Sequence, residues 1–284
     1  MSDQIFSEFD AKQVPRLLYG TAWKEDETKR LVELALSQGF RGIDTANQRK
    51  HYFERAVGDG IAAAIQEGLV VRDDLFLQTK FTFQRGQDHR LPYDPEAPIG
   101  KQVEQSFAKS LEHLNVEKLD SYVLHGPSVA RGLGPADWEA WHAMEAIHRN
   151  GSVSRLGISN VSAEQLSLLC SKATVLPGFV QNRCYAVHGW DLDVRRICNE
   201  HDIAYQGFSL LTANQRELGS SLLKEIAKRH SRTPAQIVFR FALDIGMLPL
   251  TGTTNVEHMR QDLAVFDFQL NSQEVMAIES ISTR

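Results

Sequence analysis

The feature that most constrains the fold is a regular alternation of short β-rich runs with amphipathic helical runs. Eight such pairs occur along the chain, and this alternation is typical of a parallel sheet covered by helices. Strands are expected at Arg16–Trp23, Gly42–Ala46, Asp74–Phe81, Leu119–His125, Ser154–Asn160, Gly178–Ala186, Ala204–Leu210 and Met247–Thr251. Helices are expected at Asp26–Ser37, Phe53–Gln66, Ile99–Leu114, Ala136–Arg149, Ala163–Cys170, Asp191–Glu200, Leu218–His230 and Val256–Val265.

Eight units within 284 residues predict an α/β fold, a (β/α)8 TIM barrel formed as a single domain over residues 1–284. Such a barrel needs about 250 residues. A further helix over Ala235–Leu243 is expected as an insertion between the seventh and eighth units, and Gln84–Pro98 as one long loop. A doubly wound sheet alternates in the same way, but no G-x-G-x-x-G opens a helix here, since Gly58 and Gly60 lie inside one. Helix boundaries carry the expected signals at Ser162, Thr233, Gly39, Gly151 and Gly246.

Composition excludes several classes of protein. A formal net charge of −5 lacks the basic footprint of a nucleic-acid binder. No apolar run approaches the roughly 18 residues that cross a bilayer. The polar segment Met1–Gln13 is unlike a secretory signal, and Cys170, Cys184 and Cys198 form no CxxC pair. We therefore expect a cytoplasmic protein and, because this fold completes its own core, a monomer that binds neither nucleic acid nor membrane.

Polar residues close otherwise apolar strands, at the end of the barrel where such enzymes hold their active sites. They are Asp44, Lys80, His125, Asn160 and Gln181. One such residue can simply cap a strand, but five in consecutive units predict a site.

The residue types in this set suggest a proton-transfer site. Asp44 and Lys80 are expected to form an ion pair across adjacent strands. An ammonium beside a proton donor lowers the pKa of that donor, and His125 adds a hydrogen-bond donor. The candidate proton donor is Tyr52, at the start of the second helix, with His51 as a competitor.

Several ordered motifs resemble the aldo-keto reductases over about residues 17–270. They are Gly42-Ile43-Asp44-Thr45-Ala46, Lys80 after Leu77-Gln78-Thr79, Leu124-His125 before Pro127, Gly157-Ile158-Ser159-Asn160 and Gly252-Thr253-Thr254. The resemblance implies a catalytic tetrad of Asp44, Tyr52, Lys80 and His125 that needs no metal.

The same resemblance implies an extended nicotinamide cofactor across the barrel mouth. The carboxamide would be held by Ser159, Asn160 and Gln181, and the nicotinamide ring would stack on Phe208. The loop with Ser209, Leu211, Gln215 and Glu217 would cover the pyrophosphate. Gly252, Thr253, Thr254, His258, Gln261 and Asp262 would hold the adenosine end. The substrate walls would come from Trp23, Tyr52, Phe83 and His125.

The chain departs from the family pattern in four places. Seven residues separate Asp44 from Tyr52, more than in many members. Gly126 replaces a bulky aromatic, which predicts a wider pocket. The last turn offers only His258 and Arg260 to a 2′-phosphate, and Gln261-Asp262 stands where Glu-Asn is frequent. We therefore expect NADP(H) to be favoured by a thin margin, with NAD(H) possible.

Together these features predict an NAD(P)H-dependent oxidoreductase that reduces a small aldehyde or ketone to an alcohol. Two alternatives stay open from the sequence. A barrel hydrolase or lyase could use Asp44 and His125 as acid and base, although no second strand-end carboxylate is convincing. A cofactor-sensing regulatory subunit could share the fold.

Overall fold

The protein is built on a closed barrel of eight parallel strands, each hydrogen-bonded to the next in chain order. The computed structural model describes residues 14–283. Strand β8 pairs with β1 and thereby closes the sheet. The predicted (β/α)8 fold is confirmed. The strands are β1 (Leu18–Gly20), β2 (Gly42–Asp44), β3 (Phe76–Phe81), β4 (Leu119–Leu124), β5 (Val153–Ser159), β6 (Phe179–Arg183), β7 (Ala204–Phe208) and β8 (Leu248–Thr251).

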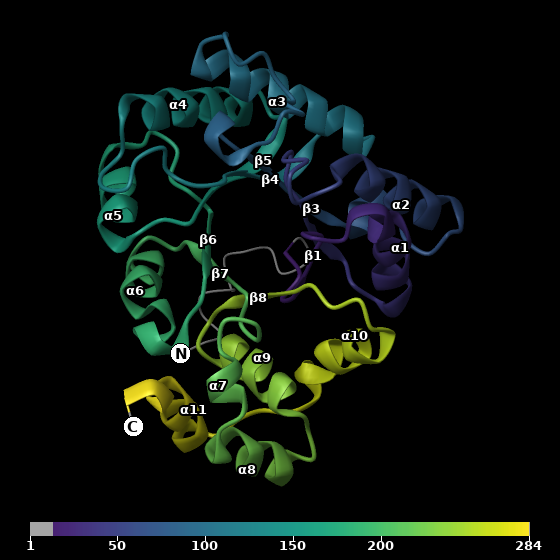
Figure 1. Ribbon diagram of the computed structural model, residues 1–284, viewed down its shortest axis with the longest axis vertical. Helices are drawn as coiled ribbons and strands as arrows, with labels where there is room; N and C mark the ends of the chain where they lie inside the picture. Colours follow the sequence, from purple (N-terminus) through teal and green to yellow (C-terminus); the bar gives the residue numbers. More distant parts are fainter. Residues whose placement is uncertain (1–13, 284) are drawn as a thin grey trace.

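Helices surround the strands, as the view along the barrel shows (Figure 1). They are α1 (Thr28–Gln38), α2 (Glu54–Gln66), α3 (Ile99–Leu114), α4 (Pro135–Arg149), α5 (Ala163–Lys172), α6 (Leu192–Glu200), α7 (Gln215–Leu218), α8 (Ser221–His230), α9 (Pro234–Asp244), α10 (Val256–Leu263) and α11 (Ser272–Glu279). The predicted helices coincide with these to within a few residues, except around α7 to α9.

Local signals in the sequence explain the helix ends. The side chains of Ser162 and Thr233 accept hydrogen bonds from the backbone N–H groups of Gln165 and Gln236, which caps α5 and α9. Gly39 follows α1 with a φ of 112°, in the left-handed region that glycine adopts without strain. These expected boundaries are confirmed.

The helices between β7 and β8 differ from the prediction. The expected insertion, α9, is the helix that packs against the barrel, because eight consecutive residues from Gln236 to Leu243 are buried and it contacts β8. Helix α8 buries only Leu223, Ile226 and Ala227 and lies at the outer edge beside α9 and α11 (Figure 1). Residues Gln215–Leu218, expected partly as loop, form the short helix α7. Amphipathicity alone could not tell which helix faces the strands.

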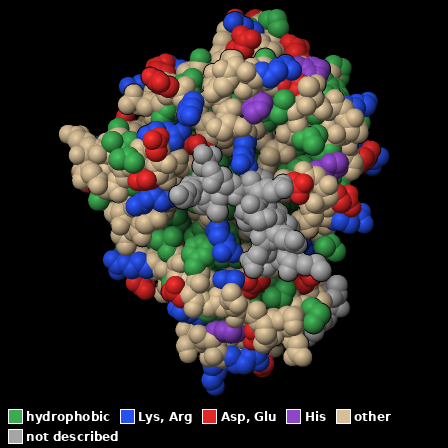
Figure 2. All heavy atoms as spheres, turned by 180° about the vertical axis from the view of Figure 1, so that it is seen from behind, with side chains coloured by type: hydrophobic (Ala, Val, Ile, Leu, Met, Phe, Trp, Pro, Cys, Tyr) green, Lys and Arg blue, Asp and Glu red, His purple; other side chains and the backbone are tan. Residues whose placement is uncertain are grey.

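The expectation for Met1–Gln13 falls outside the described residues. Across residues 14–283, every helix falls short of the length and apolar content that a bilayer span requires. Figure 2 shows the face opposite to that of Figure 1, on which basic and acidic side chains lie interspersed around the edge.

The two ends of the barrel interior have different chemistry. Apolar side chains fill the end at which the strands begin, and they include Leu18, Phe76, Phe179 and Leu248. Further along the strands the interior is polar, with Gln78, Lys80, Gln181 and Gln206 all buried. The apolar side chains at the end where the strands begin exclude water from that side. The polar layer is therefore accessible only from the end where the strands finish, the mouth of the barrel.

Close contact between α2 and α3 generates a stability prediction. A Cβ added at Gly58 would lie 2.0 Å from the carbonyl oxygen of His113, which belongs to backbone and cannot rotate away. We expect Gly58→Ala to lower the free energy of unfolding by about 1–3 kcal/mol, the usual cost of overpacking. Urea denaturation checks this value. The matched control is Gly100→Ala in α3, where a Cβ finds its nearest atom at 3.6 Å. An equal effect of both substitutions would contradict the packing argument.

Candidate active site

The polar strand-end residues predicted from the sequence meet at one end of the barrel. Asp44 is the last residue of β2, Lys80 the fifth of β3's six residues, and His125 directly follows β4. Ser159 ends β5 and pairs in register with Gln181 of β6. Closure of the sheet therefore places residues that are far apart in sequence side by side around one end of the barrel.

A buried ion pair lies at the centre of this lining. Lys80 Nζ is 2.7 Å from both Oδ1 and Oδ2 of Asp44 and donates a third hydrogen bond to the carbonyl oxygen of Thr45 at 2.8 Å. The Lys80 side chain is fully buried and that of Asp44 is 4% exposed. Burial lowers the pKa of Lys80, and the Asp44 carboxylate opposes that shift. All three ammonium donors are thus satisfied inside the protein.

Three glutamines extend this ion pair into a network. Gln78 Nε2 and Gln181 Nε2 both donate to Asp44 Oδ1, at 2.7 Å and 2.9 Å. Both also donate to Gln206 Oε1 at 2.8 Å. A carboxylate only accepts hydrogen bonds, so Asp44 obliges both amides to point their nitrogens toward it. The side-chain Oε1 of Gln181 is thereby left as an acceptor without a hydrogen-bond partner among residues 14–283.

The contributions of Gln78 and Gln206 were not expected from the sequence. The available signal was spacing, because Gln78 lies two residues before Lys80 in β3 and so shares its inward face.

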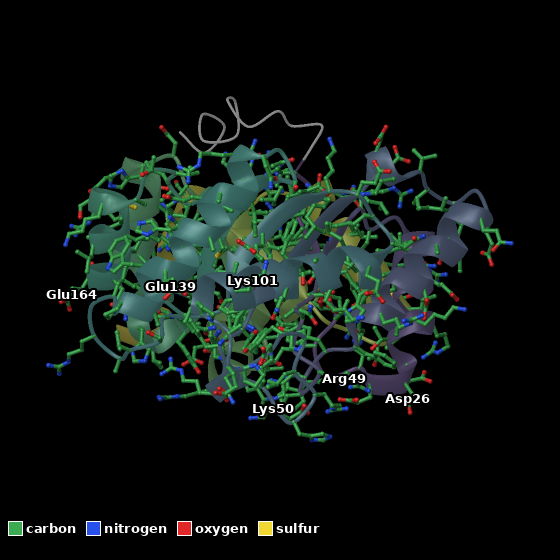
Figure 3. All side chains as sticks on the ribbon, turned by 90° about the horizontal axis from the view of Figure 1, so that it is seen from above. Asp26, Arg49, Lys50, Lys101, Glu139 and Glu164 are labelled. Atoms are coloured by element: carbon green, nitrogen blue, oxygen red, sulfur yellow. The ribbon has the colours of Figure 1, made fainter. Side chains whose placement is uncertain are left out.

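The loop after β2 carries Tyr52 to the ion pair. Lys80 Nζ lies 5.3 Å from the centroid of the Tyr52 ring, and the Tyr52 and His125 ring centroids are 6.0 Å apart in an edge-on arrangement. The added length of this loop places Arg49 and Lys50 at the periphery of the same end of the barrel (Figure 3). Asp44, Tyr52, Lys80 and His125 therefore lie together, although the loop differs in length from the family pattern.

Burial, and then the negative charge of Asp44, raises the pKa of the Tyr52 phenol well above its usual range. The direction is opposite to the one expected from Lys80 alone, because Asp44 largely neutralises that charge. Tyr52 therefore carries its proton throughout the neutral pH range.

A hydroxyl group orients His125. Thr82 Oγ1 lies 2.6 Å from His125 Nδ1, and among the described residues it has no other hydrogen-bond partner. The hydroxyl proton is satisfied only if Nδ1 accepts it, which leaves the imidazole proton on Nε2. Burial, followed by the charge of Lys80, lowers the pKa of His125 to about 3. His125 is therefore a neutral hydrogen-bond donor, and the contribution of Thr82, like those of Gln78 and Gln206, was not expected from the sequence.

A pocket of about 540 Å³ opens beside these residues. Of the predicted substrate walls, Phe83 and His125 line it, as do His51 and Gly126. Tyr52 is not in its lining. Trp23 is also outside this lining: its side chain is 71% exposed, and its ring centroid lies 4.0 Å from that of His51, which does line the pocket. A Cβ added at Gly126 would meet only ordinary contacts, the nearest at 3.5 Å from Asn160 Cβ.

The residues expected to hold a nicotinamide ring lie on the adjacent arc of the barrel mouth. Ser159 Oγ donates to the Gln181 carbonyl oxygen at 2.6 Å, and Asn160 Nδ2 donates to Ser159 Oγ at 3.1 Å. Phe208 ends β7 and is half-buried, with the Arg183 guanidinium 5.6 Å from its ring centroid. Ser209 and Leu211 follow directly, and Ser209 has a φ of 56°.

Two residues at the turn after β8 differ from the expectation: Lys24 reaches this turn although the sequence did not indicate it, and Asp262 is buried. Lys24 was not singled out in the sequence, yet its buried Nζ donates to the Gly252 carbonyl oxygen at 2.7 Å, and burial lowers its pKa to about 8. Asp262, expected to face the adenine, is buried and accepts a 2.6 Å hydrogen bond from Thr251. Burial raises the Asp262 pKa to about 6.

The remaining residues of this turn are accessible from solvent. Thr254 and His258 are exposed, and Thr253 is half-buried. Arg260 Nε donates to Gln38 Oε1 at 2.9 Å, and the Gln261 side chain donates to Glu257 at 3.4 Å. Across residues 14–283, no three His, Cys, Asp or Glu side chains gather in a way that could hold a metal ion.

The chain is similar to known proteins over nearly its whole length. The model of the aldo/keto reductase family matches residues 16–283. The chain is 30% identical to an NAD(P)H-dependent 6′-deoxychalcone synthase of Glycine max, over 91% of this chain and 82% of the relative. An aldo/keto reductase structure from Brucella melitensis superposes with a TM-score of 0.79 at 27% identity, covering 94% and 95% of the two chains. A Bombyx mori aldo-keto reductase in complex with NADP gives 0.78 at 26% identity, covering 95% and 90%.

The buried ion pair generates a second stability prediction. Asp44→Ala leaves the Lys80 ammonium buried without its counter-charge, and we expect unfolding to become easier by about 3–5 kcal/mol. Thermal and urea unfolding at pH 7 measure this loss.

The loss of stability should shrink as the pH rises toward the pKa of free lysine. The unpaired Lys80 amine is buried in the folded variant and therefore releases its proton at a lower pH than it does in the unfolded chain. The control is Glu104→Ala, which removes an exposed partner of Lys101 and should change stability by less than about 1 kcal/mol. A pH-independent loss in Asp44→Ala would contradict the electrostatic explanation.

Proposed function

Because the chain belongs to the aldo/keto reductase family, whose members are NAD(P)H-dependent carbonyl reductases, we propose that it reduces an aldehyde or ketone with Tyr52 as proton donor. One observation carries this proposal. Tyr52, His125 and the Asp44–Lys80 pair lie together beside a pocket of about 540 Å³. A protonated phenol and a neutral imidazole at one point suit a substrate oxygen that gains negative charge.

The chain's own groups fit a nicotinamide cofactor. Gln181 offers a free carbonyl acceptor toward a carboxamide N–H, and Ser159 and Asn160 add further polar atoms beside it. Phe208 offers an apolar ring for stacking. Lys24 is a buried amine that has no carboxylate within ion-pair distance among the described residues, so it could compensate a phosphate. When bound, the reduced nicotinamide supplies the hydride.

The proposed roles follow from the hydrogen-bond geometry. His125 donates from Nε2 to the carbonyl oxygen of the substrate and holds it near the Tyr52 hydroxyl. Tyr52 gives its proton to that oxygen as negative charge develops there. Lys80 then lies close enough to stabilise the phenolate, while Asp44 and the glutamines keep the ammonium in place.

The hydrolase or lyase alternative needs a second carboxylate near Asp44. The nearby buried acid, Glu54, is already engaged: it accepts from Thr79 Oγ1 and lies 2.9 Å from His113 Nδ1. This engagement favours the reductase. A regulatory subunit would bind the cofactor without reducing a generic aldehyde, so a turnover assay separates it from the reductase.

For the cofactor we propose NADP(H) in preference to NAD(H). Lys24 lies against the barrel, where it suits the pyrophosphate that both cofactors carry. His258 is exposed in the first turn of α10, further from the strands, and suits the 2′-phosphate. Thr253, Thr254 and the helix start add neutral donors.

The proton donor is tested by Tyr52→Phe. This change removes one hydroxyl and keeps the ring, so aldehyde reduction should fall by at least about 10²–10⁴-fold. NADPH binding, measured by quenching of protein fluorescence, should persist. His51→Ala is the control, since His51 lines the pocket beside Tyr52. Near-normal turnover in Tyr52→Phe, together with a loss in His51→Ala, would move the role to His51.

Cofactor choice is tested by dissociation constants for NADPH and NADH at pH 6 and pH 8. We expect a preference for NADPH of about 1–3 kcal/mol, the scale of one or two charge-assisted hydrogen bonds.

Two variants separate the cations. Lys24→Met should weaken both cofactors, and His258→Ala should weaken NADPH alone. Equal affinities at both pH values would show that this turn does not bind the 2′-phosphate.

A further inference from the structure

The substrate pocket carries charged side chains of only one sign, which is positive. Its lining includes one guanidinium, that of Arg85, and two imidazoles, those of His51 and His125, but no aspartate or glutamate. Burial lowers the pKa of both histidines, so both are neutral at pH 7. The pocket therefore carries a net positive charge that arises from Arg85.

Arg85 is fixed in position without being neutralised. Its Nη1 donates to the Ser128 carbonyl oxygen at 2.5 Å, and its Nη2 donates to the Pro127 carbonyl oxygen. Backbone carbonyls orient a guanidinium but leave its full charge, and each terminal nitrogen keeps a further N–H. Among residues 14–283 no carboxylate lies within ion-pair distance of Arg85. Asp88, the acid in the same loop, is instead paired with Arg90.

The cofactor does not account for this charge. Arg85 lies in the loop after β3 and is fastened to the loop after β4, whereas Lys24 and His258 flank the turn after β8. In the closed strand order β4 stands opposite β8. A cofactor held along the ends of β5 to β8 would direct its phosphates toward Lys24, on the side of the barrel opposite to Arg85. An anionic group that binds Arg85 therefore belongs to the substrate rather than to the cofactor.

We infer that the preferred substrates are carbonyl compounds bearing an anionic oxygen group, a carboxylate or a phosphate ester, that binds the Arg85 guanidinium. This inference rests on the proposed reductase function and specifies its substrate class. A planar guanidinium with two free N–H groups matches the two oxygens of a carboxylate.

The test compares aldehydes of equal shape and different charge. We would measure kcat/KM with NADPH for 4-carboxybenzaldehyde and its neutral isostere 4-formylbenzamide, and for glyceraldehyde 3-phosphate and glyceraldehyde. The wild-type enzyme should favour the anion of each matched pair by about tenfold or more, the scale of one charge-assisted hydrogen bond. The preference should fall as salt is raised, because Arg85 is exposed. The pair that discriminates more strongly shows whether carboxylate or phosphate is preferred.

Variants separate charge recognition from loop packing. Arg85→Met should remove the preference for the anionic aldehyde and leave turnover of the neutral 4-formylbenzamide nearly unchanged. Arg85→Lys, which keeps the positive charge, should retain part of that preference. Arg149→Met, an exposed arginine at the end of α4, is the control and should change nothing. As a readout independent of turnover, calorimetry should find that benzoate binds the wild type more tightly than benzamide does, and that Arg85→Met loses this difference.

The outcomes are distinguishable. Equal rates for the charged and neutral aldehydes in the wild type would overturn the anionic substrate class while leaving the reductase function intact. A loss of both rates in Arg85→Met would overturn it as well, by showing that Arg85 only braces the two loops. Failure to reduce any of the four aldehydes would instead count against the proposed function.

Discussion

The rest of the site depends on a lysine ammonium held inside the barrel by a carboxylate. A buried charge is costly unless it is paired and hydrogen-bonded, and here Asp44 supplies the charge while Thr45 supplies a third acceptor. The need to satisfy this carboxylate also fixes the side chains around it. Since Asp44 accepts from Gln78 and Gln181, the orientation of both amides follows from its charge, and the side-chain Oε1 of Gln181 is left without a partner among the described residues. One ion pair thus determines the direction of several hydrogen bonds.

The same pair explains why the proposed proton donor stays protonated. Lys80 lies within 5.3 Å of the Tyr52 ring centroid, but its charge is matched by Asp44, so burial dominates and the Tyr52 pKa rises. In our proposal the phenol gives up its proton only when a substrate oxygen has become basic enough to take it. His125, kept neutral by burial and oriented by Thr82, suits a role as hydrogen-bond donor rather than as acid.

Closure of the sheet divides the mouth into two arcs. The ends of β5 to β8 carry amide, hydroxyl and aromatic groups, and Lys24 reaches the turn after β8. The loops after β2 to β5 enclose the pocket, with Arg85 as its charge. A cofactor and a substrate can therefore approach the central tetrad from opposite sides. The glycine at position 126 and the long loop beyond Phe83 shape the second arc without filling it.

Much of this arrangement was readable in the sequence, because it depends on local patterns. Alternating periodicity specified the barrel, glycines and hydroxyl caps marked helix ends, and polar residues ending apolar strands identified Asp44, Lys80, His125 and Gln181. A barrel with parallel strands brings strand ends together whatever the loops do, so those residues had to meet.

Other features depended on the tertiary structure, since they arise from contacts between segments that share no local pattern. Helices α8 and α9 are both amphipathic, and only packing decided that α9 faces the strands. Trp23 has a left-handed φ of 63° and a ring contact with His51, and Asp262 is buried with a hydrogen bond from Thr251. Lys24 and Arg85 gained their significance because, within residues 14–283, neither has a carboxylate in ion-pair distance, and this is recognisable only when the surroundings of each cation are known.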